Sequence, residues 1–367
     1  MINLDKLVEV GISISQATDI SAYLSNAGYV ADFTESDLVD GVTVPESKVM
    51  VVSSAEDVQA NFKDGTKYSQ DLIDLFMQKN NAKPNQGKIN NVFIYQKTTE
   101  DDFGAAFSAF FAKKADYAQV NISSKKLADI QAVARLAELN NRLFVGQTEE
   151  AVTGLGSYAN TKILHHPDTE SLDTSLTCVM ANSNLGSVGD LYSKFSGVNP
   201  QEYTSSQMNE FDAANVAYYS TVNPINGGGV SQYGTPILYG NKQANGEITK
   251  RRYIRYTVDL LLKAGVIDFL AKKLSYQESS NNVLEGMLKA ILINCQSNDL
   301  ITKDSEDTQG LYLKAMPLSQ IRKLYAADYA KQIYRVMGWY IDALTGTKVI
   351  IDLAVNPTDA EKSAYEI

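Results

Sequence analysis

The residues best suited to proton transfer or metal binding are the chain's two histidines, which are adjacent, His165 and His166. Imidazole is a common general base and a common zinc ligand. The pair follows an apolar run and is expected to end a strand, where successive side chains point to opposite faces. The two rings therefore cannot easily converge on one metal or one substrate proton, and a structural role is the favoured interpretation.

Other short motifs of catalytic or nucleotide-binding type are incomplete. Gly154-Leu155-Gly156 lacks the third glycine of a dinucleotide-binding loop, and Ser123-Ser124-Lys125-Lys126 contains an S-x-x-K string without its companion motifs. Ser124 is more simply interpreted as the N-cap of the helix that follows. The acidic run at 304–307 lacks the ligand ladder of a calcium loop. We therefore predict no catalytic, cofactor-binding or metal-binding residues.

Charge and cysteine content argue against further classes of protein. The 43 Asp and Glu residues outnumber the 33 Lys and Arg residues, and the net charge is −10, so we expect no nucleic-acid partner. Cys178 and Cys295 lie far apart without C-x-x-C spacing, which fits a reducing compartment. No segment approaches the ~18 consecutive apolar residues of a membrane span, and the N-terminus lacks a signal-peptide pattern. We expect a protein that is made in a cytoplasm and not inserted into a membrane.

Short β-branched runs alternate with amphipathic stretches in the first half of the chain. The expected strands are 49–52, 92–95, 117–122, 143–145, 163–165 and 176–180. Apolar residues at helical spacing occupy 68–76 and 127–137, between expected strands. This order predicts an α/β domain whose sheet is mainly parallel, with helices on its faces.

A glycine-rich stretch from 222 to 249 is the clearest interruption of this pattern. A long helix with one apolar stripe is expected at 253–274 and a second helix near 281–293. Shorter strand-like segments follow, so we predict a second region of α+β type.

Both ends of the chain alternate apolar residues with other residues at a period of two. The apolar positions are Val8, Val10, Ile12 and Ile14 near the N-terminus and Val349, Ile351, Leu353 and Val355 near the C-terminus. Such alternation predicts a strand with one apolar face, which needs a sheet to join. The strand can complete the sheet of its own domain, which is the commoner arrangement, or add to the sheet of a neighbouring subunit.

Several short segments succeed one another in a specific order. They are Ser53-Ser54-Ala55-Glu56-Asp57-Val58 with Asn61-Phe62, the helical residues Tyr68, Leu72 and Phe76, the strand Asn91-Val92-Phe93-Ile94-Tyr95, Ile163-Leu164-His165-His166-Pro167, Lys194-Phe195-Ser196-Gly197-Val198, and residues 209–219 with the glycine-rich stretch and long helix after them. Over roughly residues 50 to 355 this order resembles that of the sheath proteins of contractile phage tails, in their compact myophage form. Lys63 departs from the family pattern, which usually has glycine after the phenylalanine.

The resemblance implies an α/β chain, α+β overall, with four parts. These are an N-terminal arm (1–20), an outer α/β domain (21–215), an inner sheath core domain (216–348) and a C-terminal strand arm (349–367). Sheath subunits form stacked hexameric rings around a tail tube, exchange strands through both arms, and contract to drive the tube through a cell envelope.

The resemblance also implies partners and a location. The partners are other copies of the chain, a tail tube protein, and baseplate and tail terminator proteins. The location is the virion tail, after synthesis in the host bacterial cytoplasm. Lys250, Arg251 and Arg252 form the one concentrated basic cluster and are the candidate tube-facing residues, because an acidic tube would attract them.

Two other interpretations stay open. The chain fits equally the sheath of a bacteriocin or another phage-derived injection particle. A different class of protein, a doubly wound α/β enzyme with a helical second domain, would need a convergent polar pocket at the carboxyl ends of the strands. The sequence does not display such a pocket.

Overall fold

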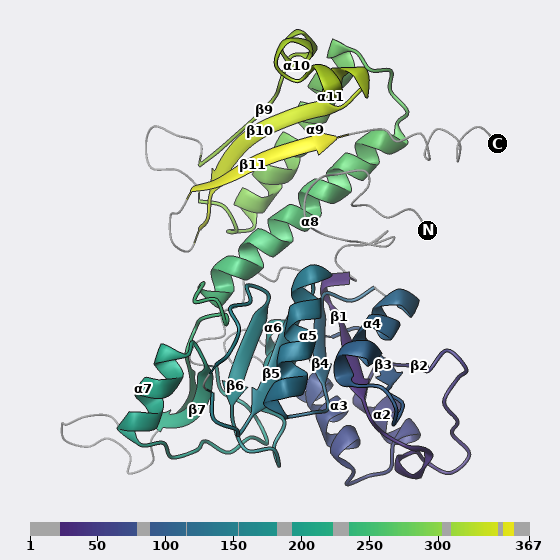
Figure 1. The fold of residues 1–367 in the computed structure, drawn as a ribbon, viewed down its shortest axis with the longest axis vertical. Coiled ribbons are helices and arrows are strands. Elements are labelled where there is room, and N and C mark those ends of the chain that lie inside the picture. The colour runs from purple at the N-terminus through teal and green to yellow at the C-terminus, as the bar shows by residue number, and fades with distance from the viewer. Residues whose placement is uncertain are drawn as a thin grey trace. The chain divides into compact units, whose positions relative to one another are not determined.

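The computed structural model describes residues 23–78, 89–114, 116–152, 154–181, 193–222, 235–302, 310–343 and 348–355. Two compact units meet in the sequence at Arg252 and Tyr253. We call the unit that ends at Arg252 the α/β unit, and the unit that begins at Tyr253 the C-terminal unit (Figure 1).

An eight-stranded sheet forms the centre of the α/β unit, with the strand order β2-β3-β1-β4-β5-β6-β7-β8. The strands are β1 (Asn26–Ala31), β2 (Val49–Val52), β3 (Asn91–Gln96), β4 (Gln119–Ile122), β5 (Leu143–Thr148), β6 (Thr161–His165), β7 (Ala217–Val222) and β8 (Thr235–Tyr239). All neighbours from β3 to β7 in this order pair in parallel, and only the edge strands β2 and β8 are antiparallel. The prediction of a mainly parallel α/β sheet is confirmed.

Helices cover both faces of this sheet. They are α2 (Ala55–Asn61), α3 (Lys67–Met77), α4 (Phe103–Lys113), α5 (Leu127–Leu139), α6 (Leu172–Met180) and α7 (Ser205–Ala213). On β1, Val30 packs into the apolar cluster that α4 and α5 help to form, whereas Tyr29 and Ala31 pack into the cluster of α2 and α3. The alternation of side chains along each strand therefore supplies two separate cores.

The strand expected at 176–180 is wrong, because these residues belong to helix α6. All nine residues of α6 are buried, so the helix shows no polar face from which its period could be read. Strands β1, β7 and β8 were not expected. Because β7 and β8 join the large sheet, the α/β unit continues to Arg252, whereas the outer domain that the resemblance implied ended at residue 215.

Two long helices and a small antiparallel sheet make up the C-terminal unit. Its elements are α8 (Thr249–Ala271), which begins in the α/β unit, α9 (Glu278–Ser297), β9 (Leu311–Ala315), α10 (Leu318–Leu324), α11 (Ala326–Ala330), β10 (Tyr334–Ile341) and β11 (Lys348–Val355). The strand order is β11-β10-β9. Leu313, Val336 and Leu353 are buried on the inner face of this sheet, and α9 is held to β9 by a hydrogen bond from the Ala315 N–H to Glu285 (3.0 Å). The two predicted helices and the α+β character of this region are confirmed.

Candidate functional site

The two histidines contact different groups, as the sequence predicted. His165 stacks on Phe211 with 4.4 Å between ring centroids. His166 is fully buried, and its Nε2 lies 2.8 Å from Glu170 Oε2. The rings therefore do not form one binding site.

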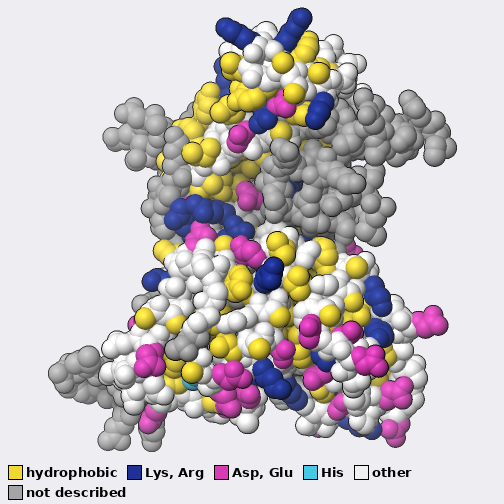
Figure 2. All heavy atoms as spheres, viewed as in Figure 1, with side chains coloured by type: hydrophobic (Ala, Val, Ile, Leu, Met, Phe, Trp, Pro, Cys, Tyr) yellow, Lys and Arg dark blue, Asp and Glu magenta, His cyan; other side chains and the backbone are white. Residues whose placement is uncertain are grey.

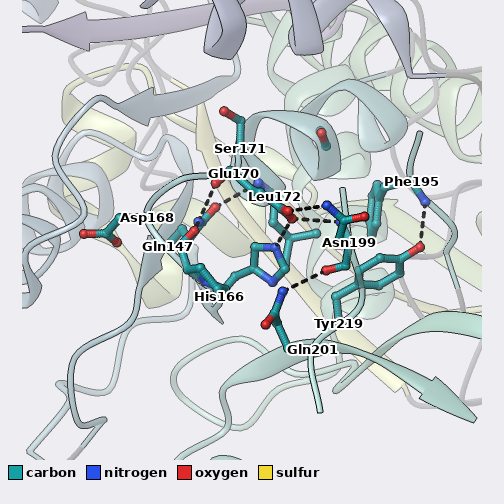
Figure 3. Close-up of polar contacts among 12 residues, drawn as sticks. Gln147, His166, Asp168, Glu170, Ser171, Leu172, Phe195, Asn199, Gln201 and Tyr219 are labelled. Atoms are coloured by element: carbon teal, nitrogen blue, oxygen red, sulfur yellow. Dashed lines mark hydrogen bonds and ion pairs between the residues drawn. The ribbon is translucent and has the colours of Figure 1, made fainter. Parts of the chain in front are cut away.

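His166 belongs to a network that holds residues 199–201 against the loop after β6 (Figure 3). Glu170 accepts hydrogen bonds from the main-chain N–H (2.8 Å) and the side-chain amide (2.6 Å) of Asn199. Gln147 on β5 donates to the carbonyls of Pro167 (2.8 Å) and Glu170 (2.7 Å). The carbonyl oxygen of the same Gln147 side chain accepts the N–H of Leu172 at the start of α6 (2.9 Å). These bonds fix a loop and a helix start, which is a structural task.

Burial and hydrogen bonding set the charges in this network. Burial lowers the pKa of His166, which keeps the imidazole neutral. Burial alone would raise the pKa of Glu170, but hydrogen bonds from His166 and Asn199 outweigh it and lower that pKa. A neutral imidazole therefore donates to an ionised carboxylate.

A second cluster of polar side chains is buried near the carboxyl ends of β1 and β4. Lys125 Nζ lies 2.6 Å from Asp173 Oδ1, and both side chains are buried. Asp71 on α3 accepts hydrogen bonds from the hydroxyls of Tyr29 and Ser171. These charges pair inside the unit and are closed to solvent, so they are not placed to meet a substrate from solution.

Doubly wound sheets bind ligands where the strand order reverses, which here is the gap between β1 and β4. Asp32 follows β1 and accepts hydrogen bonds from the hydroxyls of Ser123 (2.7 Å) and Tyr68 (3.1 Å). The side chain of Lys67 bonds to the Ser123 carbonyl. The polar groups of this gap thus bond to one another, which does not favour the enzyme interpretation.

Ser124 does not cap α5, because the N-cap position belongs to Lys126. Its hydroxyl accepts the Lys126 N–H (3.3 Å) and donates to Asp129 (2.6 Å). The described residues contain no group of three or more His, Cys, Asp or Glu side chains placed to hold a metal ion. Within the same ranges, no helix combines the length and apolarity that crossing a membrane requires.

The C-terminal assembly candidates lie on β11. Ile351, Leu353 and Val355 are buried on its inner face, and Val349 is half-buried. The strand pairs antiparallel with β10 of its own chain, with Leu353 opposite Val336. In the single chain, β11 therefore completes the sheet of its own unit. The N-terminal candidates Val8, Val10, Ile12 and Ile14 lie outside the described residues.

The basic cluster occupies the first turn of α8, and its three side chains are half-buried. Arg252 Nε donates to Asn160 Oδ1 (2.7 Å), and Arg251 Nε lies 3.8 Å from Glu247. Both arginines are thus engaged within the α/β unit, and Lys250 is the remaining member of the cluster.

The outer face of the three-stranded sheet carries apolar side chains that the sequence analysis did not single out. Tyr312, Met337 and Ile350 are 49%, 46% and 78% exposed. Trp339 stacks on Tyr312 with 6.4 Å between ring centroids. A usable signal existed, because residues 334–341 are apolar at nearly every position, which predicts a strand covered on both faces.

Exposed apolar surface is concentrated in the C-terminal unit. Most of the exposed large hydrophobic side chains among the described residues belong to it, although it is the smaller unit. Figure 2 shows hydrophobic side chains gathered on the visible side of this unit. Apolar patches of this kind mark surfaces that bind other macromolecules.

Comparison with protein-family models and with curated proteins finds no match to the chain. Solved structures share its fold, among them two sheath proteins. The sheath tail protein of Desulfitobacterium hafniense aligns with a TM-score of 0.60 at 8% identity, over 95% of this chain and 100% of that chain. A sheath from an extracellular contractile injection system, the PVC sheath complex in its contracted state, aligns with a TM-score of 0.58 at 11% identity, over 96% of this chain and 95% of that chain.

The chain therefore has the fold of contractile sheath proteins. The resemblance inferred from the order of its segments is confirmed at the level of the fold.

Proposed function

We propose that the chain is a structural subunit of a contractile sheath, which polymerises around a tube and contracts to drive that tube through a cell envelope. The observation that carries the proposal is the extent of the match, since both sheath structures cover at least 95% of this chain. An enzyme that merely shared a doubly wound domain would match the α/β unit alone.

The proposed assembly consists of stacked hexameric rings, with the C-terminal unit as the inner core next to the tube. Its partners are a tube protein, baseplate proteins and a terminator protein. The particle is a phage tail or another phage-derived injection device, such as a bacteriocin, assembled in the bacterial cytoplasm. Lys250 is the basic residue we would test first for contact with an acidic tube.

We propose that neighbouring subunits are linked by strand addition. The sheet of the C-terminal unit ends in the edge strands β9 and β11, whose outward main-chain groups suit a further strand. The alternating residues Val8, Val10, Ile12 and Ile14 have the pattern of such a strand. Residues 349–367 form the second proposed arm, in which β11 would exchange its own β10 for that of a neighbour.

Electron microscopy of the purified full chain, with and without tube protein, tests the proposal. We expect rings or tubes, and a chain that stays monomeric at high concentration in both conditions would overturn it. Deleting residues 1–15 should leave a folded chain, by circular dichroism, that no longer assembles. This deletion is cleaner than removal of 349–367, because the C-terminal unit needs β11 for its own sheet. Normal assembly of the shortened chain would refute exchange through the N-terminus.

A further inference from the structure

The outer sheet face of the C-terminal unit has an apolar centre. By the outer sheet face we mean Tyr312, Met337, Trp339 and Ile350 together with the flanking Lys314 and Asp352. Tyr312, Trp339 and Ile350 lie opposite one another on β9, β10 and β11, so they form one row across the sheet. A row of three large apolar side chains is costly to leave in water.

Charged residues on this face surround its apolar centre, and Arg335 on β10 pairs with Asp352 (3.6 Å) and Asp328 (2.7 Å). In the neighbouring row, Met337 is central, with Lys314 on one side and Asp352 on the other. A hollow of about 220 Å³ opens beside Tyr312 and Met337 and is also lined by Pro317 and Gln320. An apolar centre with a charged rim is the usual anatomy of a protein interface.

Helix α9 carries a second uncovered surface, the α9 outer face. It consists of the exposed residues Asn282, Val283, Gly286, Ala290, Ile293, Asn294 and Ser297. None of these seven residues is charged, and Val283 and Ile293 are 40% and 49% exposed. A Cβ added to Gly286 would meet no atom within 4 Å, so this side of the helix is open. The charged residues of α9 lie off this face, since Glu278 and Glu285 accept the N–H groups of Leu318 and Ala315, and Lys289 stands at its edge.

The two faces lie on opposite sides of the same unit. Leu284, Leu288 and Leu292 line the buried side of α9, which is the side held to β9. At 3.6 residues per turn, Gly286, Ile293 and their neighbours project from the other side of the helix. The outer sheet face in turn points away from α9, because the inner residues of each strand are the buried ones.

We propose that the outer sheet face of one copy of this chain docks against the α9 outer face of a second copy. The α9 outer face brings no charge, so it can cover Trp339 and Ile350 without burying an unpaired ion. Gly286 and Ala290 allow the helix to approach the Tyr312–Trp339 pair closely. Two different faces on opposite sides of one unit give a head-to-tail contact, which builds rings or helical filaments and does not stop at a dimer.

This contact rests on the proposed sheath function, since it requires self-assembly, but it is separate from strand addition through the N-terminal arm. Its first test places a charge on each face. Ile350→Lys and Ile293→Lys should each raise the concentration needed for assembly of the full chain at least about tenfold, measured by sedimentation. Leu139→Lys on α5 is the matched control, because Leu139 is 73% exposed in the α/β unit, and it should assemble like the wild type.

All three variants should keep the wild-type unfolding midpoint, because the replaced side chains are exposed. If the wild type assembles and either face variant assembles equally well, the docking proposal is overturned while the sheath function stands. If the wild type never assembles, the sheath function itself falls.

A second test reports which faces meet. Ile350→Cys and Ile293→Cys add accessible thiols to a chain whose two native cysteines are buried. Treated with a short bismaleimide, a mixture of the two variants should give a cross-linked dimer, and neither variant alone should. Cross-linking of Ile350→Cys with itself would show that two sheets pair face to face, and would refute the head-to-tail contact.

Discussion

Lys125 and Asp173 form an ion pair of 2.6 Å although their side chains are only 2% and 1% exposed. Lys125 follows β4 and Asp173 lies in the first turn of α6, so the pair joins a strand end to a wholly buried helix. Burial alone would lower the pKa of Lys125, but the nearby Asp173 and Asp71 outweigh it and raise that pKa. The ammonium therefore stays charged inside the α/β unit.

Removing one partner of this pair should be far more harmful than removing both. Lys125→Met leaves the Asp173 carboxylate buried without its cation and should cost about 3–5 kcal/mol of unfolding free energy in urea titrations. The double variant Lys125→Met with Asp173→Leu should recover most of that loss, because no buried charge remains. A loss below about 1 kcal/mol for the single variant would show that the pair is not buried in solution.

Asp74 on α3 should make the α/β unit less stable as the pH rises. Burial raises the pKa of Asp74 to about 7, with Asp71 adding to the effect and the hydrogen bond from Gln70 opposing it. The folded chain thus holds a proton that the unfolded chain has released above about pH 4. The stability that protonated Asp74 contributes is full below that pH and is lost as the pH rises toward 7.

Asp74→Asn should therefore flatten the pH dependence of the unfolding midpoint between about pH 4 and 7 and stabilise the chain near pH 8. Asp40→Asn, at a side chain that is 97% exposed in the same unit, is the control and should leave the profile unchanged. An Asp74→Asn profile that matches the wild type would mean that Asp74 is ionised in the folded chain at all these pH values.

Local patterns predicted much of the α/β unit, because β-branched runs such as Val49–Val52 and helical spacing such as that of α3 are visible within a few residues. Helix α6 was missed because burial on all sides removes its period. The Lys125–Asp173 pair joins residues 48 positions apart, and no local pattern records such a contact. The outer sheet face was missed for a related reason, since Tyr312, Trp339 and Ile350 form a row only once three strands have paired.

His166 should make the α/β unit less stable in mild acid. Burial holds its pKa below the ordinary value, so the unfolded chain binds the proton first as the pH falls below about 6.5. The free energy of unfolding has its full value above that pH and falls as the pH drops toward the pKa of His166 in the folded chain. Glu170, Asp173 and Lys125 are the charged groups that act on His166. Protonation of Glu170, whose pKa is lowered, adds a further loss below about pH 4.5.

His166→Gln should keep the hydrogen bond to Glu170 through its amide and lose the slope between about pH 7 and 5, measured as thermal midpoint against pH. His165→Gln is the comparison, because burial lowers the pKa of His165 too, but its ring is only half-buried. We expect His165→Gln to reduce the pH dependence of the thermal midpoint less than His166→Gln does. An unchanged slope in His166→Gln would rule out His166 as the group responsible.

Gly338 on β10 should tolerate no side chain, whereas Gly286 on α9 should accept one. A Cβ at Gly338 would lie 2.3 Å from the carbonyl oxygen of Tyr312 and 2.9 Å from the Cα of Leu313, both of them main-chain atoms of β9. Gly338→Ala must therefore push β9 away from β10, at an expected cost of about 1–3 kcal/mol. Trp339, the only tryptophan of the chain, follows Gly338, so its fluorescence during denaturant unfolding reports on this sheet.

Gly286→Ala meets open space in the middle of a helix and should stabilise the same unit by about 0.5–1 kcal/mol. Equal effects of the two substitutions would contradict the close approach of β9 and β10 on which the outer sheet face depends.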